Sequence, residues 1–234
     1  MLKKLLALVC AILAHPVVAA DESDIRKAME ERLGAKVESV TKAGYLGLYE
    51  VYADGNIFYT DEKISAIMVG GQLIDGRSMK NVTEERLRKL TAIRFADLPL
   101  EQAIKIVRGD GKRSLAVFED PNCGYCKRLA KELQKLDNIT LHIFLYPILS
   151  EDSVRKSKQI WCSADRAKAW KEWMVDGKTP SGRENCDASA VARNQEFGRR
   201  LNISGTPTLF FVDGERVPGA VPLTRIEQKL SQTP

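Results

Sequence analysis

The sequence predicts a protein of mixed α/β and α+β class, with a small β-rich N-terminal domain followed by a larger, layered α/β domain. Short β-branched and aromatic runs, separated by Gly and Asp-Gly turns, fill residues 36–75. From residue 100 onward, strand-like and helix-like segments alternate and end in a hairpin and a helix. A polar stretch with helical spacing of its apolar residues lies between the two parts.

Residues 1–20 have the composition of a cleavable secretory signal. Lys3 and Lys4 precede an apolar run over residues 5–13, and small residues end the segment. The run is too short to span a bilayer comfortably, which disfavours an uncleaved membrane anchor. We expect cleavage before Asp21 and an exported mature chain without a transmembrane helix.

The charge balance disfavours nucleic acid as a partner. The chain has 36 Lys and Arg against 31 Asp and Glu, a net charge of +5, and loss of the signal lowers this charge to +3. The positive residues form no dense basic block. The length fits two domains, or one domain with an appendage.

Residues 21–82 are assigned to the N-terminal domain. Ser23 and Asp24 are typical of a helix start, which predicts a helix over residues 24–33 with Gly34 after its end. Strand-like runs follow at 37–40, 45–52, 57–59 and 64–69. Together they predict a small antiparallel sheet with one helix.

A thin sheet of this size buries little apolar core by itself. Pairing with an identical copy, through an edge strand near Ile67–Ile74, would supply the missing contacts. The alternative is that the sheet packs on the C-terminal part of its own chain. The residues alone do not decide between the two.

Residues 83–99 are assigned to a linker helix. Asn81, with Glu84 three residues later, is typical of a helix start. Apolar residues follow at a helical spacing among Arg and Lys, namely Leu87, Leu90 and Ile93. Pro99 is expected to end the helix.

Residues 100–234 are assigned to the α/β domain. Strands are expected at 103–107, 115–118, 139–146 and 208–212, and helices at 124–136 and 223–230. The turn at Asp213-Gly214 and residues 216–217 complete a terminal hairpin. A helical insertion at about 150–200 interrupts the alternation, with helical stretches at 153–175 and 187–201.

Cys123 and Cys126 form a Cys-x-x-Cys pair between a predicted strand and a predicted helix. A Cys at a helix N-terminus lies beside unsatisfied backbone N–H groups and the positive end of the helix dipole, which favour the thiolate. Because the thiolate is the attacking species, this placement predicts Cys123 as the nucleophile. Cys126, one turn later, is expected to face inward and to resolve the intermediate. Pro121 and Gly124 leave the approach to Cys123 open.

A half zinc site and an inert disulfide are the other interpretations of this pair. Zinc would require a second close cysteine pair or several histidines, and only His142 follows the signal. We therefore expect no metal.

Cys162 and Cys186 lie far apart, in a helical stretch beside Trp161 and in a polar loop after Gly182. A bond between them would close a loop worth roughly 3 kcal/mol in the chain-entropy model. A structural disulfide is the favoured interpretation. A second redox-active pair is the alternative, but neither cysteine is predicted at an activating helix N-terminus.

Three features together resemble the DsbC family of periplasmic disulfide isomerases, which belong to the thioredoxin superfamily. They are the motif Cys123-Gly124-Tyr125-Cys126 after a strand, the segment Gly205-Thr206-Pro207-Thr208 before a hairpin, and the helical insertion with Cys162 and Cys186. The likeness covers essentially the whole chain, and the combination is more specific than the Cys-x-x-Cys motif alone.

The resemblance implies a thioredoxin-like catalytic domain and a cystatin-like N-terminal domain that holds a V-shaped homodimer around an apolar cleft. It implies that Pro207 is a cis-proline, preceded by Thr206, beside the cysteine pair, with Gly124 and Tyr125 in the substrate-binding active-site loop. A cis X–Pro bond costs only about 0.5–1 kcal/mol. It can present the backbone of Thr206 to an extended substrate. A trans proline that opens a strand is the alternative.

The resemblance also implies isomerisation of wrongly paired disulfides in exported periplasmic proteins, through a mixed disulfide at Cys123. It implies the membrane reductase DsbD as electron donor, and no cofactor, because two thiols suffice. The alternatives are a dithiol oxidase, a chaperone without chemistry, and a DsbG-like isomerase, whose motif has Pro where this chain has Gly124.

Thioredoxin has a buried acid six residues before its first active-site cysteine, where this chain has Val117. Glu119 and Asp120 are expected to be solvated residues at a strand end, and a proton-relay role for either is the less favoured alternative. His142 alternates with apolar residues along a strand and is expected to be a surface or packed residue. A Cys–His hydrolase is therefore disfavoured.

Overall fold

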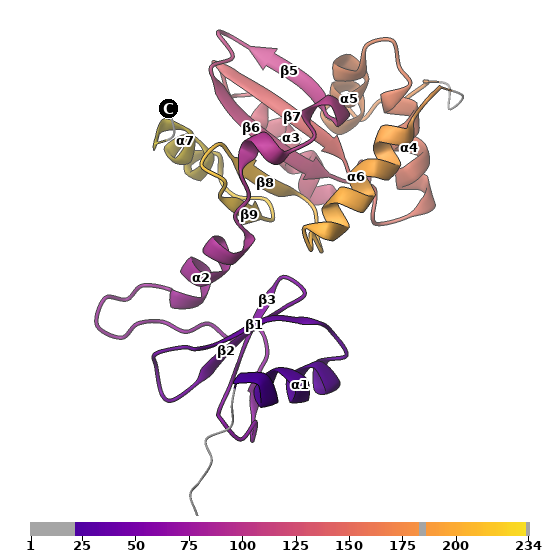
Figure 1. Cartoon of the computed structure of the whole chain (residues 1–234). Coiled ribbons are helices and arrows are strands. Elements are labelled where there is room, and N and C mark those ends of the chain that lie inside the picture. Colours follow the sequence, from indigo (N-terminus) through magenta and orange to yellow (C-terminus); the bar gives the residue numbers. More distant parts are fainter. Residues whose placement is uncertain (1–21, 183–185, 233–234) are drawn as a thin grey trace, which may run out of the picture. The chain divides into compact units, whose positions relative to one another are not determined.

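The computed structural model describes residues 22–182 and 186–232, and the signal expected at 1–20 lies outside them. The chain divides into two compact units, with the boundary between Gly71 and Gln72, and each unit is described by itself (Figure 1). Within the described ranges, no helix combines the length and the apolar character needed to cross a bilayer.

The N-terminal unit is one helix on a four-stranded antiparallel sheet, in agreement with the predicted α+β domain. Its elements are α1 (Glu22–Leu33), β1 (Val37–Lys42), β2 (Tyr49–Ala53), β3 (Asn56–Thr60) and β4 (Ile67–Met68), in the sheet order β1-β2-β3-β4. Ile25 and Met29 of α1 are fully buried against the apolar residues of β1 and β2. Asp54 and Gly55 both have positive φ, as the tight hairpin between β2 and β3 requires.

Two strands of this unit are shorter than predicted. Leu46 and Gly47 adopt positive φ, so the chain turns there and β2 begins only at Tyr49. The edge strand expected near Ile67–Ile74 has only two residues in β4, and among the described strands it pairs with β3 alone. The side chains of Met68 and Val69 are 46% and 69% exposed at this edge.

Helix α2 (Val82–Thr91) begins where the sequence predicts. The Asn81 side chain accepts a hydrogen bond from the Glu84 N–H at 2.9 Å. The helix ends at Thr91, before the predicted end near Pro99, because the residues that follow pack against the apolar core of the second unit. Leu98 is buried in an extended connection, with short 3₁₀ turns at Phe95–Asp97 and Leu100–Gln102.

The second unit has a five-stranded sheet in the order β5-β7-β6-β8-β9, which confirms the predicted α/β layer domain. Its strands are β5 (Ile104–Arg108), β6 (Arg113–Glu119), β7 (Ile139–Leu145), β8 (Thr208–Phe211) and β9 (Arg216–Pro218). Strands β6 and β7 are parallel and are joined through α3 (Gly124–Leu133), and the other neighbours are antiparallel.

The two faces of this sheet bury different side chains because successive residues of a strand point to opposite faces. Leu115 and Val117 of β6 belong to the apolar cluster that includes α3 and α7 (Leu223–Gln232). Phe118 lies on the other face, where its ring stacks on Phe144 at 4.4 Å between centroids. Helix α6 (Ser189–Arg200) contributes to the cover of this aromatic face.

The helical stretch predicted over residues 153–175 is two helices, α4 (Glu151–Trp161) and α5 (Arg166–Met174). The break is explained by Asp165, whose side chain accepts from the Lys168 N–H at 2.9 Å and caps α5. Residues 162–165 therefore separate the two helices, and α5 contacts both α4 and α3.

Candidate active site

Cys123 is placed at the junction between β6 and α3. It is the N-cap residue of α3, and its Sγ accepts a hydrogen bond from the Cys126 N–H at 3.5 Å. The Cys123 N–H in turn donates to the Asp120 carbonyl at 3.0 Å, which closes the turn after the strand. The strand–turn–helix context inferred from the sequence is therefore present, and the sulfur faces the positive end of the helix dipole.

The segment before β8 completes the site from a distant part of the chain. The Thr206–Pro207 peptide bond is cis, and the Cys123 Sγ–H donates to the Thr206 carbonyl at 3.3 Å. Strand β8 pairs antiparallel with β6, so the sheet itself brings Thr206 to the end of β6. Cys123, Thr206 and Pro207, which were all expected in the site, therefore lie together.

The two thiols differ in access. Both are in the reduced form; the Cys123 residue is 7% exposed and Cys126 is fully buried. The approach to Cys123 is narrower than the sequence suggested, but of the two cysteines Cys123 alone has exposed surface. An incoming disulfide would therefore meet Cys123 first.

Burial raises the pKa of Cys126 far above the usual value for a thiol, and the negative charge of Glu119 raises that pKa further. A hydrogen bond with Thr206 opposes this shift in part. Cys126 is therefore held as a neutral thiol, and it must lose a proton before it can act as a nucleophile.

The two acids before the motif are buried, which corrects the expectation that Glu119 and Asp120 are solvated. Asp120 is completely buried, and its carboxylate accepts hydrogen bonds from three backbone N–H groups at 2.7–2.9 Å, those of Asn122, Ile148 and Leu149. These bonds replace the water that the charge loses. Asp120 thereby ties the turn before Cys123 to the loop after β7.

Glu119 is 1% exposed and has fewer partners. The Trp170 indole N–H donates to Oε1, while Oε2 has no hydrogen-bond partner among the described residues. Burial raises the pKa of Glu119 to about 8; the bond from Trp170 lowers it, and the charge of Asp120 raises it. The strand pattern could have found this residue, because Glu119 continues the buried face of Leu115 and Val117.

Helix α5 supplies a second indole to the same segment. The Trp173 N–H donates to the Pro121 carbonyl at 2.7 Å. The Lys127 Nζ lies 3.7 Å from the centroid of the Trp173 ring, and the Lys156 Nζ lies 4.9 Å from it. The sequence carried no signal for these contacts, because they join residues that are far apart along the chain.

Exposed apolar side chains adjoin the motif. Tyr125 is 61% exposed, with the Arg128 guanidinium 4.3 Å from its ring centroid. Ile148 and Leu149, whose N–H groups are bound by Asp120, are 38% and 58% exposed. Gly124 has no heavy atom within 4 Å of the position that a Cβ would take, so this side of the motif is open.

Cys162 and Cys186 form a disulfide with their Cα atoms 5.6 Å apart. Cys162 is the C-cap residue of α4, so neither its position nor its neighbours resemble those of Cys123. Nearby, the Trp161 indole donates to the Asp187 carbonyl at 3.2 Å.

His142 lies on the opposite face of the sheet from the reduced cysteines. Its ring is 5.9 Å from that of Phe95 between centroids, and burial and Lys105 lower its pKa. It is therefore a packed neutral residue that takes no part in the site. Among the described residues, no cluster of three or more His, Cys, Asp or Glu could hold a metal ion.

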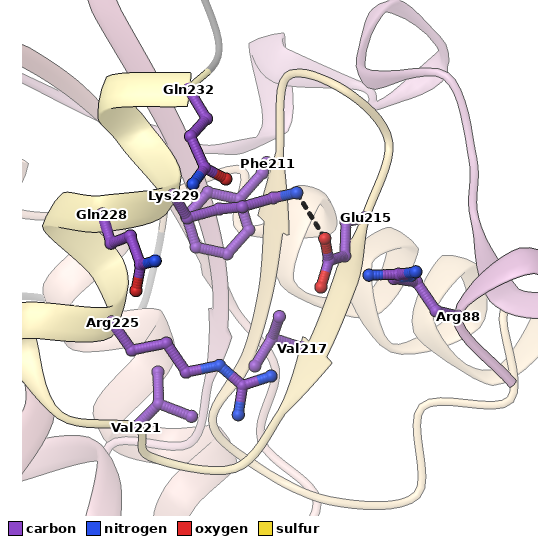
Figure 2. A pocket seen from close by; sticks show the side chains of 9 residues that line it. All are labelled: Arg88, Phe211, Glu215, Val217, Val221, Arg225, Gln228, Lys229 and Gln232. Atoms are coloured by element: carbon purple, nitrogen blue, oxygen red, sulfur yellow. Dashed lines mark ion pairs between the residues drawn. The ribbon is translucent and has the colours of Figure 1, made fainter. Parts of the chain in front are cut away.

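A pocket of about 170 Å³ lies between α2, β9 and α7, and no cysteine lines it (Figure 2). Arg88 and Arg225 border it, and Lys229 pairs with Glu215 inside the group of lining residues. Lys229 also contacts Asp213 at 2.5 Å. Lys229 thus joins α7 to the turn before β9, and the pocket is separate from the thiol site.

Family comparisons agree with this geometry in both units. Residues 100–234 match the family model described as a thioredoxin-like domain. Residues 16–84 match the model described as the disulfide bond isomerase protein N-terminal domain.

Individual relatives cover most of the chain. It is 49% identical over 197 residues to a probable thiol:disulfide interchange protein DsbC of Bordetella pertussis, which covers 84% of this chain and 69% of the relative. It is 27% identical over 219 residues to the thiol:disulfide interchange protein DsbC of Escherichia coli, covering 91% of this chain and 89% of the relative.

A solved structure of a disulfide interchange protein from Neisseria gonorrhoeae is 42% identical, with a TM-score of 0.55. The match covers 58% of this chain and 97% of that one. With the reduced Cys-x-x-Cys pair at a helix N-terminus, these matches establish that the chain belongs to the DsbC family of thiol:disulfide interchange proteins and is a thiol–disulfide oxidoreductase.

Proposed function

We propose that this protein is a periplasmic disulfide isomerase in which Cys123 attacks wrongly paired disulfides of exported proteins. The observation that carries the proposal is the position of Cys123, at the N-terminus of α3 and in contact with the Thr206 carbonyl. A buried, reduced Cys126 lies one helical turn behind it. This arrangement provides one accessible nucleophile and one protected thiol.

The reaction begins when the Cys123 thiolate attacks one sulfur of a substrate disulfide. A mixed disulfide forms, and the other substrate sulfur leaves as a thiolate. That thiolate attacks another disulfide of the substrate, and a later substrate thiolate displaces Cys123. No net electrons are transferred. If rearrangement stalls, Cys126 attacks Cys123 and releases the substrate reduced, which leaves the enzyme oxidised.

The oxidised enzyme needs a dithiol reductant to return to its working form. We assign this role to a membrane reductase of the DsbD type, because the family resemblance implies it. The two electrons pass from the reductant's thiols to the bond between Cys123 and Cys126 by the same exchange chemistry, without any cofactor.

Substrate is expected to bind across the motif as an extended chain. The backbone of Thr206, beside the cis-proline Pro207, can pair with such a chain. The exposed side chains of Tyr125 and Leu149 offer apolar contact, and Gly124 adds no side chain that could obstruct it.

The N-terminal domain, assigned to residues 21–82, is proposed to hold two copies together. Its sheet has a two-residue edge strand with exposed Met68 and Val69, and its core is small. Residues 83–99 would connect it to the catalytic domain at 100–234. The segment 1–20 is proposed to direct export to the periplasm and to be removed.

The proposal is tested by refolding of a scrambled multi-disulfide protein. We expect the wild type to restore native pairing and Cys123→Ala to restore none, while suppression of aggregation in the same assay is retained. Recovery by Cys123→Ala would refute the enzymatic assignment and favour a chaperone.

A second experiment tests the role of the N-terminal unit. A chain of residues 72–234, which contains the second compact unit, is compared with the full chain in sedimentation equilibrium and in the refolding assay. We expect a monomer that still reduces a small peptide disulfide but loses most isomerisation. Equal isomerisation by both would remove dimerisation from the mechanism.

A further inference from the structure

We propose that Glu119 is the proton acceptor for Cys126 when Cys126 attacks the mixed disulfide on Cys123, and the proton donor when the pair is reduced again. This inference rests on the proposed function, because it assigns a residue to the resolving step of that reaction. This chain has Val117, which cannot titrate, at the position of the buried acid in thioredoxin. The proposal gives a chemical role to Glu119, the buried acid two residues later.

The carboxyl and the thiol share one apolar environment. Glu119 is the last residue of β6, on the face that carries Leu115 and Val117, and that face packs on α3. Cys126 lies on the inner side of α3 and belongs to the same apolar cluster. Strand and helix are consecutive along the chain, so the turn between them keeps both groups at the same end of the sheet.

One oxygen of Glu119 is fixed and the other is available. The Trp170 indole N–H binds Oε1, and Trp170 is fully buried, so the carboxyl cannot turn freely. Oε2 is buried without a partner among the residues that the structure describes. Native proteins rarely bury a polar oxygen in this way, because the lost hydration is not replaced. Because Oε2 has no hydrogen-bond partner within the described part of the chain, it is free to accept and release a proton.

The proton equilibria of the two groups are coupled. The pKa of Glu119 is raised by burial to about 8, so both its forms are populated near neutral pH. The pKa of Cys126 is raised by burial and by the charge of Glu119. Protonation of Glu119 by the departing thiol proton therefore removes the charge that opposes thiolate formation. General bases whose pKa lies close to the operating pH are the effective ones.

The titratable groups that interact with Glu119 are Asp120, the residue that follows β6, and the Cys126 thiol of α3. From α5 it receives the Trp170 indole, which does not titrate. The basic residues Lys127 and Lys156 lie over the ring of Trp173 instead.

The proton moves between Cys126 and Glu119 in both directions of the reaction. In the forward direction, Cys126 transfers its proton to the Glu119 carboxylate, and its sulfur attacks Cys123. The bond between Cys123 and the substrate breaks, and the substrate leaves as a thiolate with both electrons of that bond. In the reverse direction, a reductant thiolate attacks Cys123, Cys126 leaves as a thiolate, and protonated Glu119 returns the proton.

A two-step reaction with dithiobis(nitrobenzoate) separates the two thiols. Attack by Cys123 on this aromatic disulfide releases a first coloured thiolate, and attack by Cys126 on the mixed disulfide releases a second. Stopped-flow absorbance gives a rate for each phase across the pH range. In the wild type we expect the second phase to rise with an inflection near pH 8.

Glu119→Gln is the main variant, because Gln can still accept the Trp170 hydrogen bond but cannot take a proton. We expect an unchanged first phase, and a second phase at least about 10-fold slower near neutral pH, a modest value for the loss of a general base. The inflection near pH 8 should disappear. The control Glu101→Gln, at an exposed carboxyl, should leave both phases unchanged.

Trp170→Phe gives an independent test. It keeps the carboxyl but removes the hydrogen bond that lowers the pKa of Glu119. The inflection of the second phase should therefore move to higher pH, and the rate near neutral pH should fall.

The proposal is overturned if Glu119→Gln leaves the second phase and its pH profile unchanged, or if it slows both phases equally, which would indicate a structural role. If neither variant folds, the wild type decides: a second phase without an inflection near pH 8 also overturns it. Absence of the first phase in the wild type would instead refute Cys123 as the nucleophile and the proposed function with it.

Discussion

The two cysteine pairs of this chain occupy opposite electrostatic positions. Cys123 caps the N-terminus of α3, with its sulfur accepting the Cys126 N–H. Cys162 is at the C-cap of α4, where its N–H donates to the Lys158 carbonyl at 2.8 Å. The positive end of a helix dipole favours a thiolate and the negative end disfavours it. The first pair is reduced, while the second is closed as a disulfide.

We infer from this difference that the surroundings of a cysteine, both backbone and side chain, set its reactivity. Cys123 is itself the extended residue before a helix, and its sulfur contacts the Thr206 carbonyl. A buried acid lies nearby in the sequence. Cys162 joins the end of a helix to a polar loop, and its bond with Cys186 holds the insertion closed. We interpret the first pair as the reactive pair and the second as the structural one.

The largest effect is expected from Cys123→Ala. Thiol exchange should fall to the uncatalysed background, because the remaining Cys126 is fully buried and its pKa is strongly raised. The measurement is release of a chromogenic thiol under single-turnover conditions. Residual fast release would mean that another sulfur of the chain also attacks substrates, and would contradict the assignment of Cys123 as the reactive thiol.

Removal of the second pair should act on stability instead. In the double variant Cys162→Ala, Cys186→Ala, the free energy of unfolding should fall by about 3 kcal/mol, from the entropy of a loop of this length. Urea denaturation followed by circular dichroism measures the change. The exchange rate at Cys123 in the folded double variant serves as the control, and a large loss of that rate would indicate a second redox-active pair.

The buried acid near the reactive pair predicts a pH-dependent stability. The pKa of Glu119 is raised in the folded state, from 4.5 to about 8, so the folded protein holds this proton more tightly than the unfolded chain. Its contribution to stability is complete below the unfolded pKa and is lost as pH rises through about 8.

The wild type should therefore lose up to about 1.4 kcal/mol of unfolding free energy per pH unit within this window, relative to Glu119→Gln. Urea titrations of the reduced proteins at several pH values give the two slopes. Parallel slopes would show that the folded protein does not hold Glu119 in its protonated form.

The smallest effect is expected at the second indole of α5. Trp173→Phe removes the hydrogen bond to the Pro121 carbonyl and should cost about 1 kcal/mol in stability. Its effect on the second phase of thiol exchange should be minor, in contrast to Trp170→Phe. Thermal unfolding and stopped-flow absorbance measure the two quantities. Equal kinetic effects of the two substitutions would mean that both indoles only stabilise the fold around the motif, and that the Trp170 hydrogen bond has no special role in the exchange.

Local features followed from the sequence because neighbouring residues determine them. The Asn81 cap of α2, the Asp54-Gly55 hairpin and the start of α3 beside Cys123 are each specified within a few residues. The predicted end of α2, near Pro99, was wrong because distant residues determine it. Its length depends on the burial of Leu98 in a core built from later strands, which local spacing does not reveal.

Residue order alone was enough to infer that two cysteines lie at a helix start, that a second pair is separate from them, and that a proline segment precedes the terminal hairpin. The groups that surround the sulfur atoms, in contrast, could be identified only from the folded structure. Thr206 reaches Cys123 across 83 positions of the chain, and Trp170 reaches Glu119 across 51. Desolvation is a property of such assembled surroundings, so the burial that raises the pKa of Glu119 and of Cys126 exists only once the sheet and α5 have packed together.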